Sequence, residues 1–482
     1  MLFNSLDFAL FFPSVFVLYW LFSKHVTARN IFLLLASYFF YACWDWRFLI
    51  LIVLSSAVDF TVGLTIGKSS NKRKQKLLLL LSIITNLGLL FYFKYTNFFI
   101  ESFSAAFSFF GNPIETSTLN IILPVGISFY TFQTLSYTID VYRNKIKPTK
   151  NILAFFTFVS FFPQLVAGPI ERATHLLPQF YKTHQFNYDR VKSGLLLMGF
   201  GLFKKMVIAD RLAVLVNQVY NNPLDHSGYE VVLATVFFAF QIYCDFSGYS
   251  DIAIGISRAL GFDLRENFNR PYISKTVTEF WRRWHISLST WFRDYVYIPL
   301  GGSKKGKNRT YINLMIVFLV SGLWHGASMT FVIWGLVHGL VIVAEKKFFK
   351  KPKAYKQSIV NNTLKCFGVF VFVCFAWMFF RANSLSDAMV LIKNLFDNNY
   401  ILIFTDEIYK LGLERSEFLY ATISIILLLI FEQFRVKSKI VELLNSAPIV
   451  FRWGIYLLIV FTIIIFGVYG DQNTSEFIYF QF

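Results

Sequence analysis

The chain has 482 residues, of which 56% are hydrophobic, 20% aromatic and only 15% charged, and its mean hydropathy is +0.52. Soluble domains carry about 25% charged residues, so this composition excludes an ordinary soluble enzyme. The net charge of +18 is divided among short loops between apolar segments. Membrane orientation explains that pattern better than a polyanionic ligand does. Apolar runs able to span about 30 Å of hydrocarbon recur along the chain, so we expect a polytopic membrane protein.

The first apolar segment, residues 3–23, is interpreted as a retained helix. Asp7 stands where a signal peptide would carry a lysine or arginine, and no small-residue cleavage site follows. Further segments follow at 30–44 and 48–66. Short basic loops should lie in the cytoplasm. They are found at 68–76, 304–309, 346–356 and 435–439.

The same rule places the acidic loop between segments 363–380 and 416–432 outside. With a last helix at 452–469, it also places both ends of the chain outside. A membrane with one face toward the cytoplasm is the expected location.

The middle of the chain contains apolar segments that are interrupted. They lie near 77–94, 119–140, 150–166, 191–215 and 229–258, and the interruptions are Pro124, Gly126, Pro163, Gly168, Pro169, Lys204 and Lys205. Irregular backbone at membrane depth is tolerated only where it is buried in protein or lines a cavity. We therefore expect re-entrant or tilted helices around a central chamber. No internal repeat supports an inverted-repeat transporter.

A strongly aromatic stretch, residues 270–302, contains His285. Thr276 and Glu279 form a capping-box pattern that predicts a helix start. On one continuous helix, the apolar stripe would contain Trp281, Trp284 and His285. A buried histidine bonded to a carbonyl is one interpretation of His285. Ionisable groups inside membrane segments are costly and usually functional, which favours a functional role for His285.

The stretch SGLWHGASMTFVIWGLVHGL, residues 321–340, holds two histidines in the same Gly-x-x-His-Gly frame. The apolar run from Tyr311 to His325 is too short to cross the bilayer, so His325 is expected at mid-depth. A neutral imidazole there could act as a general base. For His338 we prefer a packing role, because Gly-x-x-x-Gly spacing lets helices approach closely.

A third cluster, QIYCDFSGYSDIAIG, places Asp245 and Asp251 in an apolar segment. These aspartates could orient a catalytic histidine, bind substrate, or pair with intramembrane arginines. Four cysteines stand singly in apolar segments and are interpreted as packing residues, so no metal is expected. Motifs of nucleotide-cradling, zincin and serine-hydrolase sites do not occur.

These motifs resemble the membrane-bound O-acyltransferases, and specifically the bacterial branch that O-acetylates alginate and peptidoglycan. The matching stretches cover most of residues 120–340. They are SFYTFQTLSYTIDVYR (128–143), FFPQLVAGPIER (161–172), YCDFSGYSDIAIG (243–255), FWRRWHISLSTWFRDYVYIPLGG (280–302) and SGLWHGASMTFVIWGLVHG (321–339). Residues before 100 and after about 350 match mainly in hydrophobicity.

The resemblance implies an all-α bundle of about 11 transmembrane helices, with re-entrant or interfacial helices around a central tunnel. It implies one integral-membrane domain over 1–482, made of N-terminal helices (1–110), a core (119–345) and C-terminal helices with a tail (360–482). It assigns the catalytic histidine of the WHG motif to His325 and a second site position to His285. The implied donor is cytoplasmic acetyl-CoA, and the implied acceptor is an extracytoplasmic polysaccharide reached through a partner protein.

The end of the chain, FIYFQF, follows the polar stretch DQNTSE. Such an apolar tail should bury itself, and the nearest dry place would be the outer mouth of the cavity. It is similar to a C-terminal motif of acyl-transfer systems in which a tyrosine, here Tyr479, is proposed as an acyl carrier. An aromatic anchor at the membrane surface is the alternative.

Two other functions remain open at this stage. Within the family, the rival is D-alanyl transfer to teichoic acid, although PLGGSKKG looks more like the acetylating branch. From another class, the protein could be a transporter or flippase whose histidines relay protons.

Overall fold

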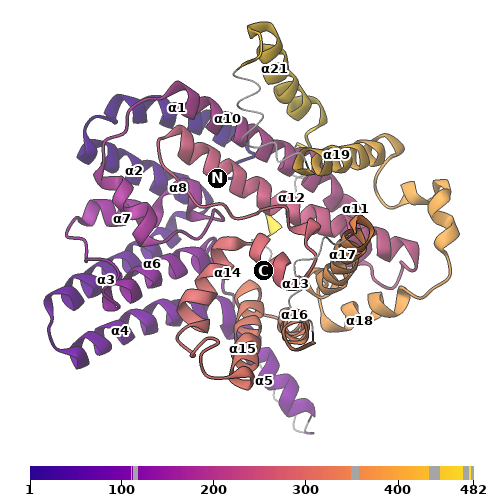
Figure 1. Cartoon of the computed structure of the whole chain (residues 1–482), viewed down its shortest axis with the longest axis horizontal. Coiled ribbons are helices and arrows are strands. Elements are labelled where there is room, and N and C mark those ends of the chain that lie inside the picture. Colours follow the sequence, from indigo (N-terminus) through magenta and orange to yellow (C-terminus); the bar gives the residue numbers. More distant parts are fainter. Residues whose placement is uncertain (110, 112–117, 349–357, 434–445, 470–476, 479–482) are drawn as a thin grey trace. The chain divides into compact units, whose positions relative to one another are not determined.

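The structure is a computed structural model and describes residues 1–109, 111, 118–348, 358–433, 446–469 and 477–478. Every regular element in these ranges is a helix (Figure 1). Seven helical stretches in the described residues are long and apolar enough to cross a membrane. They are Val26–Lys68, Lys72–Phe109, Tyr229–Ala259, Met329–Phe348, Ile359–Arg381, Arg415–Gln433 and Ile449–Phe466. The predicted all-α, polytopic fold is confirmed.

The chain forms two compact units. Unit 1 comprises residues 1–195 and 253–265, and unit 2 comprises residues 196–252 and 266–482. The boundary therefore falls inside two helices, α10 (Tyr188–Leu202) and α12 (Tyr229–Ala259).

Unit 1 begins with helices that match the predicted apolar segments. Its elements are α1 (Leu6–Phe22), α2 (Val26–Asp45), α3 (Leu49–Lys68), α4 (Lys72–Leu90), α5 (Thr96–Phe109), α6 (Ile127–Tyr142), α7 (Ile152–Ser160), α8 (Phe162–Leu165) and α9 (Ala173–Leu176). Gly126, with φ +74°, lets the chain turn directly into α6.

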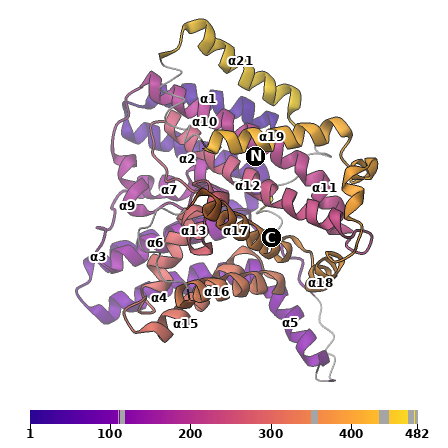
Figure 2. The same ribbon diagram turned by 45° about the vertical axis from the view of Figure 1, so that its right-hand side comes forward.

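Buried polar side chains join α3, α4 and α6, which lie side by side in Figures 1 and 2. Asn86 donates from Nδ2 to Asp59 Oδ2 at 2.9 Å, and its own Oδ1 accepts from Ser55 Oγ at 2.7 Å. Thr134 of α6 donates to the same Asn86 oxygen at 3.3 Å. Away from water such hydrogen bonds hold helices together where apolar packing alone has little preference for protein over lipid.

Unit 2 contains the histidine motifs. Its elements are the π-helix η4 (Phe203–Ala209), α11 (Asp210–Asn221), α12 up to residue 252, α13 (Val277–Arg283), α14 (Ile286–Phe292), the π-helix η6 (Arg293–Tyr297), α15 (Lys307–His325), α16 (Met329–Phe348), α17 (Ile359–Arg381), α18 (Leu385–Asn394), α19 (Arg415–Gln433) and α21 (Ile449–Phe466). Short 3-10 turns lie at Pro271–Ile273, Tyr400–Phe404 and Asp406–Lys410.

The core of unit 2 is strongly aromatic. Trp284, Trp334 and Trp377 are at most 1% exposed, and their rings contact one another at centroid distances of 5.1 Å (Trp284 to Trp377) and 5.9 Å (Trp334 to Trp377). Large rings bury much apolar area at little cost in side-chain entropy. The three rings form a continuous aromatic layer from the residue before His285 and α14 to α17. His325 and His338 both pack against Trp334 in this layer.

Candidate functional site

His285 lies at a break between two short helices. The predicted helix start is confirmed, because Thr276 caps α13 and accepts the Glu279 N–H at 3.0 Å. The single continuous helix assumed for this stretch is wrong. α13 ends at Arg283, and His285 adopts a left-handed backbone with φ +41° before α14 begins. A non-glycine residue rarely adopts this conformation, and such strain concentrates at functional sites.

Asn267 provides the physical reason for the break. Its backbone carbonyl accepts the Ile286 N–H at 2.9 Å, and its side-chain Oδ1 accepts the Ser287 N–H at 3.2 Å and Ser287 Oγ–H at 2.8 Å. Asn267 therefore satisfies amide groups at the start of α14 that a continuous helix would have satisfied internally. This contact spans about 20 residues of sequence, so periodicity could not reveal it.

The same Asn267 oxygen fixes the tautomer of His285. His285 Nδ1 lies 3.0 Å from Asn267 Oδ1. A backbone N–H can only donate, so the Asn267 atom that accepts from Ser287 must be the oxygen. His285 Nδ1 must then carry its own hydrogen and donate it. In the neutral ring, Nε2 consequently holds the lone pair and is a hydrogen-bond acceptor.

His325 is the last residue of α15 and is 2% exposed. Aromatic rings surround it, with centroids 5.0 Å away for Trp324, 5.0 Å for Trp334 and 5.5 Å for Phe380. The His285 ring is 6.3 Å from the His325 ring. The structure thus brings together the two histidines that the sequence predicts, from segments 40 residues apart.

The two Gly-x-x-His-Gly frames face each other across α15 and α16. A Cβ on Gly322 would lie 2.3 Å from the Phe331 carbonyl oxygen, and one on Gly335 would lie 2.3 Å from the Phe318 carbonyl oxygen. Only glycine permits this approach, so the predicted close packing is confirmed. It allows the α15–α16 turn to place His325 against the aromatic wall.

His338 occupies a packed position on α16. It is fully buried, and Trp281 Nε1–H donates to His338 Nδ1 at 3.2 Å. The rings of Trp281 and Trp334 lie 5.1 and 5.0 Å from its ring. Trp334 therefore lies between His338 and His325, in agreement with the packing role predicted for His338.

The aspartates of α12 pair with lysines, not with the arginines considered from sequence. Lys204 Nζ lies 2.7 Å from Asp251 Oδ2, and Lys205 Nζ lies 2.9 Å from Asp245 Oδ1 and 2.7 Å from Asp210 Oδ1. These five side chains are at most 6% exposed. Charges buried to this extent require such partners.

Two local features bring these lysines to α12. Gly201 and Gly248 pack backbone to backbone, since a Cβ on Gly201 would lie 2.6 Å from the Gly248 carbonyl oxygen. The π-helix η4 then carries both lysines, which pair with different aspartates of α12. Sequence reasoning noted these lysines only as interruptions, although two cations in an apolar segment were a usable signal.

Tyr479 lies outside the described residues, so its predicted role stays a prediction. Its neighbours Phe477 and Ile478 are 1% and 2% exposed and lie in unit 2. The expected burial of the apolar tail holds for these two residues.

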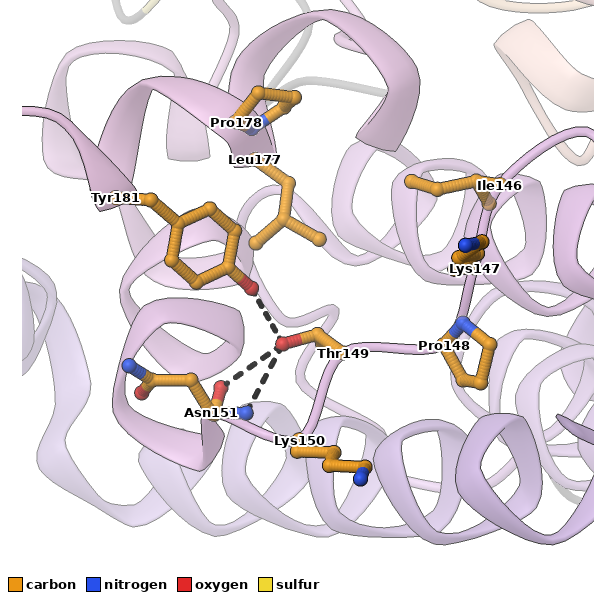
Figure 3. Close-up of a pocket in the computed structure, with 9 residues that line it drawn as sticks. All are labelled: Ile146, Lys147, Pro148, Thr149, Lys150, Asn151, Leu177, Pro178 and Tyr181. Carbon is orange, nitrogen blue, oxygen red and sulfur yellow. Dashed lines mark hydrogen bonds between the residues drawn. The ribbon is translucent and has the colours of Figure 1, made fainter. Parts of the chain in front are cut away.

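Unit 1 has a separate surface pocket with a volume of about 490 Å³ (Figure 3). It is lined by residues 146–151 together with Leu177, Pro178 and Tyr181. The Thr149 hydroxyl is engaged with Tyr181 and Asn151. No candidate catalytic residue lines it. Among the described residues there is also no cluster of His, Cys, Asp and Glu side chains suited to a metal.

The chain has relatives among known proteins. Residues 79–386 match the membrane-bound O-acyltransferase family. The chain belongs to that family. The chain is 42% identical to a probable alginate O-acetylase of Pseudomonas aeruginosa, over 82% of this chain and 75% of the relative. It is 36% identical to a peptidoglycan O-acetyltransferase of Helicobacter pylori, over 85% and 81%. It is 31% identical to a teichoic acid D-alanyltransferase of Bacillus subtilis, over 55% and 70%.

Membership of the membrane-bound O-acyltransferase family makes this multi-pass membrane protein an acyltransferase. The family region includes His285, His325, Asn267 and Asp245, whereas Phe477 and Ile478 lie beyond it. The paired histidines thus lie within the residues that match the family, and the segment at residues 477–478 lies outside them.

Proposed function

We propose that this acyltransferase moves an acetyl group from acetyl-CoA to a hydroxyl of a cell-envelope or exported polysaccharide. The observation that carries the proposal is the pair of buried rings, His285 and His325, 6.3 Å apart in the family region. A single acyl group can contact two rings at this separation. Similarity to the alginate and peptidoglycan enzymes, over 82% and 85% of the chain, supports acetate as the acyl group and a polysaccharide as the acceptor.

His325 is the general base of the proposed reaction. A thioester is already activated, so the protein must mainly place a hydroxyl nucleophile and remove its proton. The tryptophans and Phe380 around His325 exclude water, which protects the acyl group from hydrolysis.

Tyr479 is the proposed carrier between the donor and the polysaccharide. Its phenol oxygen attacks the thioester carbonyl carbon, and the carbon–sulfur bond breaks. The phenolic proton passes through His325 to the departing thiolate, which leaves an aryl acetate and free CoA. Attack of a sugar hydroxyl on that ester, with proton transfer to the phenolate, regenerates the tyrosine and gives the acetylated polysaccharide.

The tautomer of His285 limits the role that this residue can have in the proposed reaction. An oxyanion needs a donor, but neutral His285 with hydrogen on Nδ1 presents an acceptor at Nε2. Orienting a group by accepting its O–H or N–H fits this tautomer, whereas donating to an oxyanion does not.

The proposal includes a direction of transfer. Acetyl-CoA is supplied from the cytoplasm, and the ester is delivered outside to a partner protein that acts on the polysaccharide, in the bacterial cytoplasmic membrane. The apolar helices and the basic loops support this arrangement.

The test is transfer from radiolabelled acetyl-CoA by the full chain in lipid nanodiscs. We expect thioester cleavage and labelled protein from the wild type, and a loss of about 100-fold or more in His325→Ala, as for removal of a general base. His226→Gln is the matched control, because His226 lies in the loop before α12 and pairs there with Glu230 of the first helical turn. Unchanged cleavage in His325→Ala would overturn the proposed role of His325.

The same assay separates the two rivals. D-alanyl transfer predicts label from a D-alanyl carrier protein and none from acetyl-CoA. A transporter or flippase predicts no cleavage at all with a partner protein present. Wild-type protein that cleaves no acetyl-CoA under these conditions would contradict the proposed function.

A further inference from the structure

Phe477 and Ile478 lie beside the histidine site in unit 2. The Phe477 ring is 4.8 Å from the Tyr249 ring and 5.9 Å from the Phe246 ring, measured between centroids. The Phe246 ring is in turn 4.6 Å from the His285 ring, edge to face. One aromatic side chain therefore separates this terminal segment from His285.

Asp245 holds the backbone of the segment. The Ile478 N–H donates to Asp245 Oδ2 at 2.9 Å, while Asp245 Oδ1 lies 2.9 Å from Lys205 Nζ. Lys205 is shared with Asp210 at 2.7 Å. Each Asp245 oxygen thus has a different partner, one in the segment and one in the ion pair. Hydrogen bonds to an ionised acceptor in a dry site are among the stronger ones in proteins.

The chain is also attached just before residues 470–476. Val468 N–H donates to the Met206 carbonyl oxygen at 3.0 Å, and Arg211 donates from its NH2 nitrogen to the Phe466 carbonyl oxygen at 2.9 Å. Met206 belongs to η4, the π-helix that also carries Lys205. The described residues on both sides of 470–476 are therefore fixed to η4 or to the carboxylate that η4 holds.

We propose that Asp245, held by Lys205, is a positioning residue that docks the terminal segment, at Phe477 and Ile478, beside the histidine site. This role rests on the proposed function, in which Tyr479 carries the acetyl group. The backbone N–H of residue 478 can bind a fixed carboxylate whatever side chain that residue carries. Tyr249 and Phe246, in contrast, contact the aromatic side chain of residue 477. Loss of either contact should release the segment without altering the donor site.

Docking is tested first by hydrogen exchange, which requires no activity. The full chain in nanodiscs should protect the Ile478 amide, and Asp245→Leu should raise its exchange rate about tenfold or more, as for loss of a hydrogen bond to a charged group. Asp245→Asn keeps a side-chain oxygen and should retain most of the protection. Asp251→Asn is the control, because Asp251 belongs to the same helix and pairs with Lys204.

A second variant covers the case in which Asp245→Leu does not fold. Phe477→Ala leaves the Lys205 ion pairs intact and should also raise exchange at residue 478. An unprotected Ile478 amide in the wild type would overturn the docking. An equal rise in Asp251→Asn would also overturn it, because the effect would then belong to any buried ion pair of α12.

The positioning role is tested by transfer from radiolabelled acetyl-CoA. In Asp245→Leu we expect kcat to fall about tenfold or more with an unchanged KM for acetyl-CoA, and Asp245→Asn to recover most of kcat. Normal kcat in a variant whose segment exchanges freely would overturn the positioning role. Protected wild-type protein that cleaves no thioester would instead refute the proposed function, and the positioning role with it, while the docking stands.

Discussion

Asn267 determines which nitrogen of His285 bears hydrogen, and this can be tested by changing the amide. Asn267→Leu keeps the size but removes the oxygen that accepts from His285 and Ser287. We expect kcat for acetyl transfer to fall about tenfold or more with little change in the KM for acetyl-CoA. Asn267→Asp keeps an acceptor at this position and should be clearly more active than Asn267→Leu.

The comparison of the two Asn267 variants separates orientation from folding. Both disturb the Nδ2–H that Asn267 donates to Ser250 at 3.2 Å, so loss of that contact affects them equally. Equal activity of the two variants would contradict a role for the acceptor oxygen. The thermal transition of each purified variant shows whether α14 remains folded.

At this scale the sequence predicts the histidines but not their partners. The motif of His325 and the aromatic setting of His285 are local patterns. Asn267, Lys204 and Lys205 gain their roles from contacts made only after folding, with partners about 20 to 50 residues away. One sequence does not show which residues form such pairs, although charged residues in an apolar segment indicate that pairs exist.

The α15–α16 pair shows how an element depends on two glycines. Gly335→Ala would place a methyl group 2.3 Å from the Phe318 carbonyl oxygen, a backbone atom that cannot rotate away. We expect destabilisation by about 1–3 kcal/mol, the usual cost of overpacking, and a lower melting temperature in nanodiscs. Displacement of α16 should also reduce acetyl transfer, because Trp334 contacts the His325 ring.

Gly368→Ala is the matched control for that substitution. Gly368 lies inside α17, and nothing lies within 4 Å of a Cβ placed there. Alanine is the better helix former, so this variant should be as stable as the wild type or slightly more stable. Equal melting temperatures for the two variants would show that α15 and α16 separate readily and would refute the close contact.

Helices are the features that hydrophobic segments predict best here. The segments expected at 48–66, 229–258 and 363–380 are α3, α12 and α17, with ends within a few residues of the expected ones. The break at His285 was not predicted, because Asn267 replaces the hydrogen bonds of a continuous helix. The π-helix η4 was not predicted either, because its hydrogen bonds differ by only one residue in spacing from those of the α-helices beside it.

At the scale of the whole molecule, the untested expectation is its orientation in the membrane. Basic loops are retained in the cytoplasm, so residues 68–76 should lie inside and the loop after residue 381 outside. Ser70 and Ser386 are exposed in these two regions, and Ser→Cys changes little in size. Cys43 is exposed and Cys366 half-buried, so both are first replaced by serine, while the buried Cys244 and Cys374 remain.

Intact spheroplasts treated with a membrane-impermeant maleimide should label Ser386→Cys and should label Ser70→Cys only after permeabilisation. Lys304→Cys, in another basic loop, should behave like Ser70→Cys. In the proposed function this orientation gives transfer its direction, with acetyl-CoA supplied from the cytoplasm and the ester received by a polysaccharide outside. Labelling of Ser70→Cys in intact spheroplasts would show that the protein has the opposite orientation. Cytoplasmic acetyl-CoA could then not reach the site from the side of the membrane on which the basic loops lie.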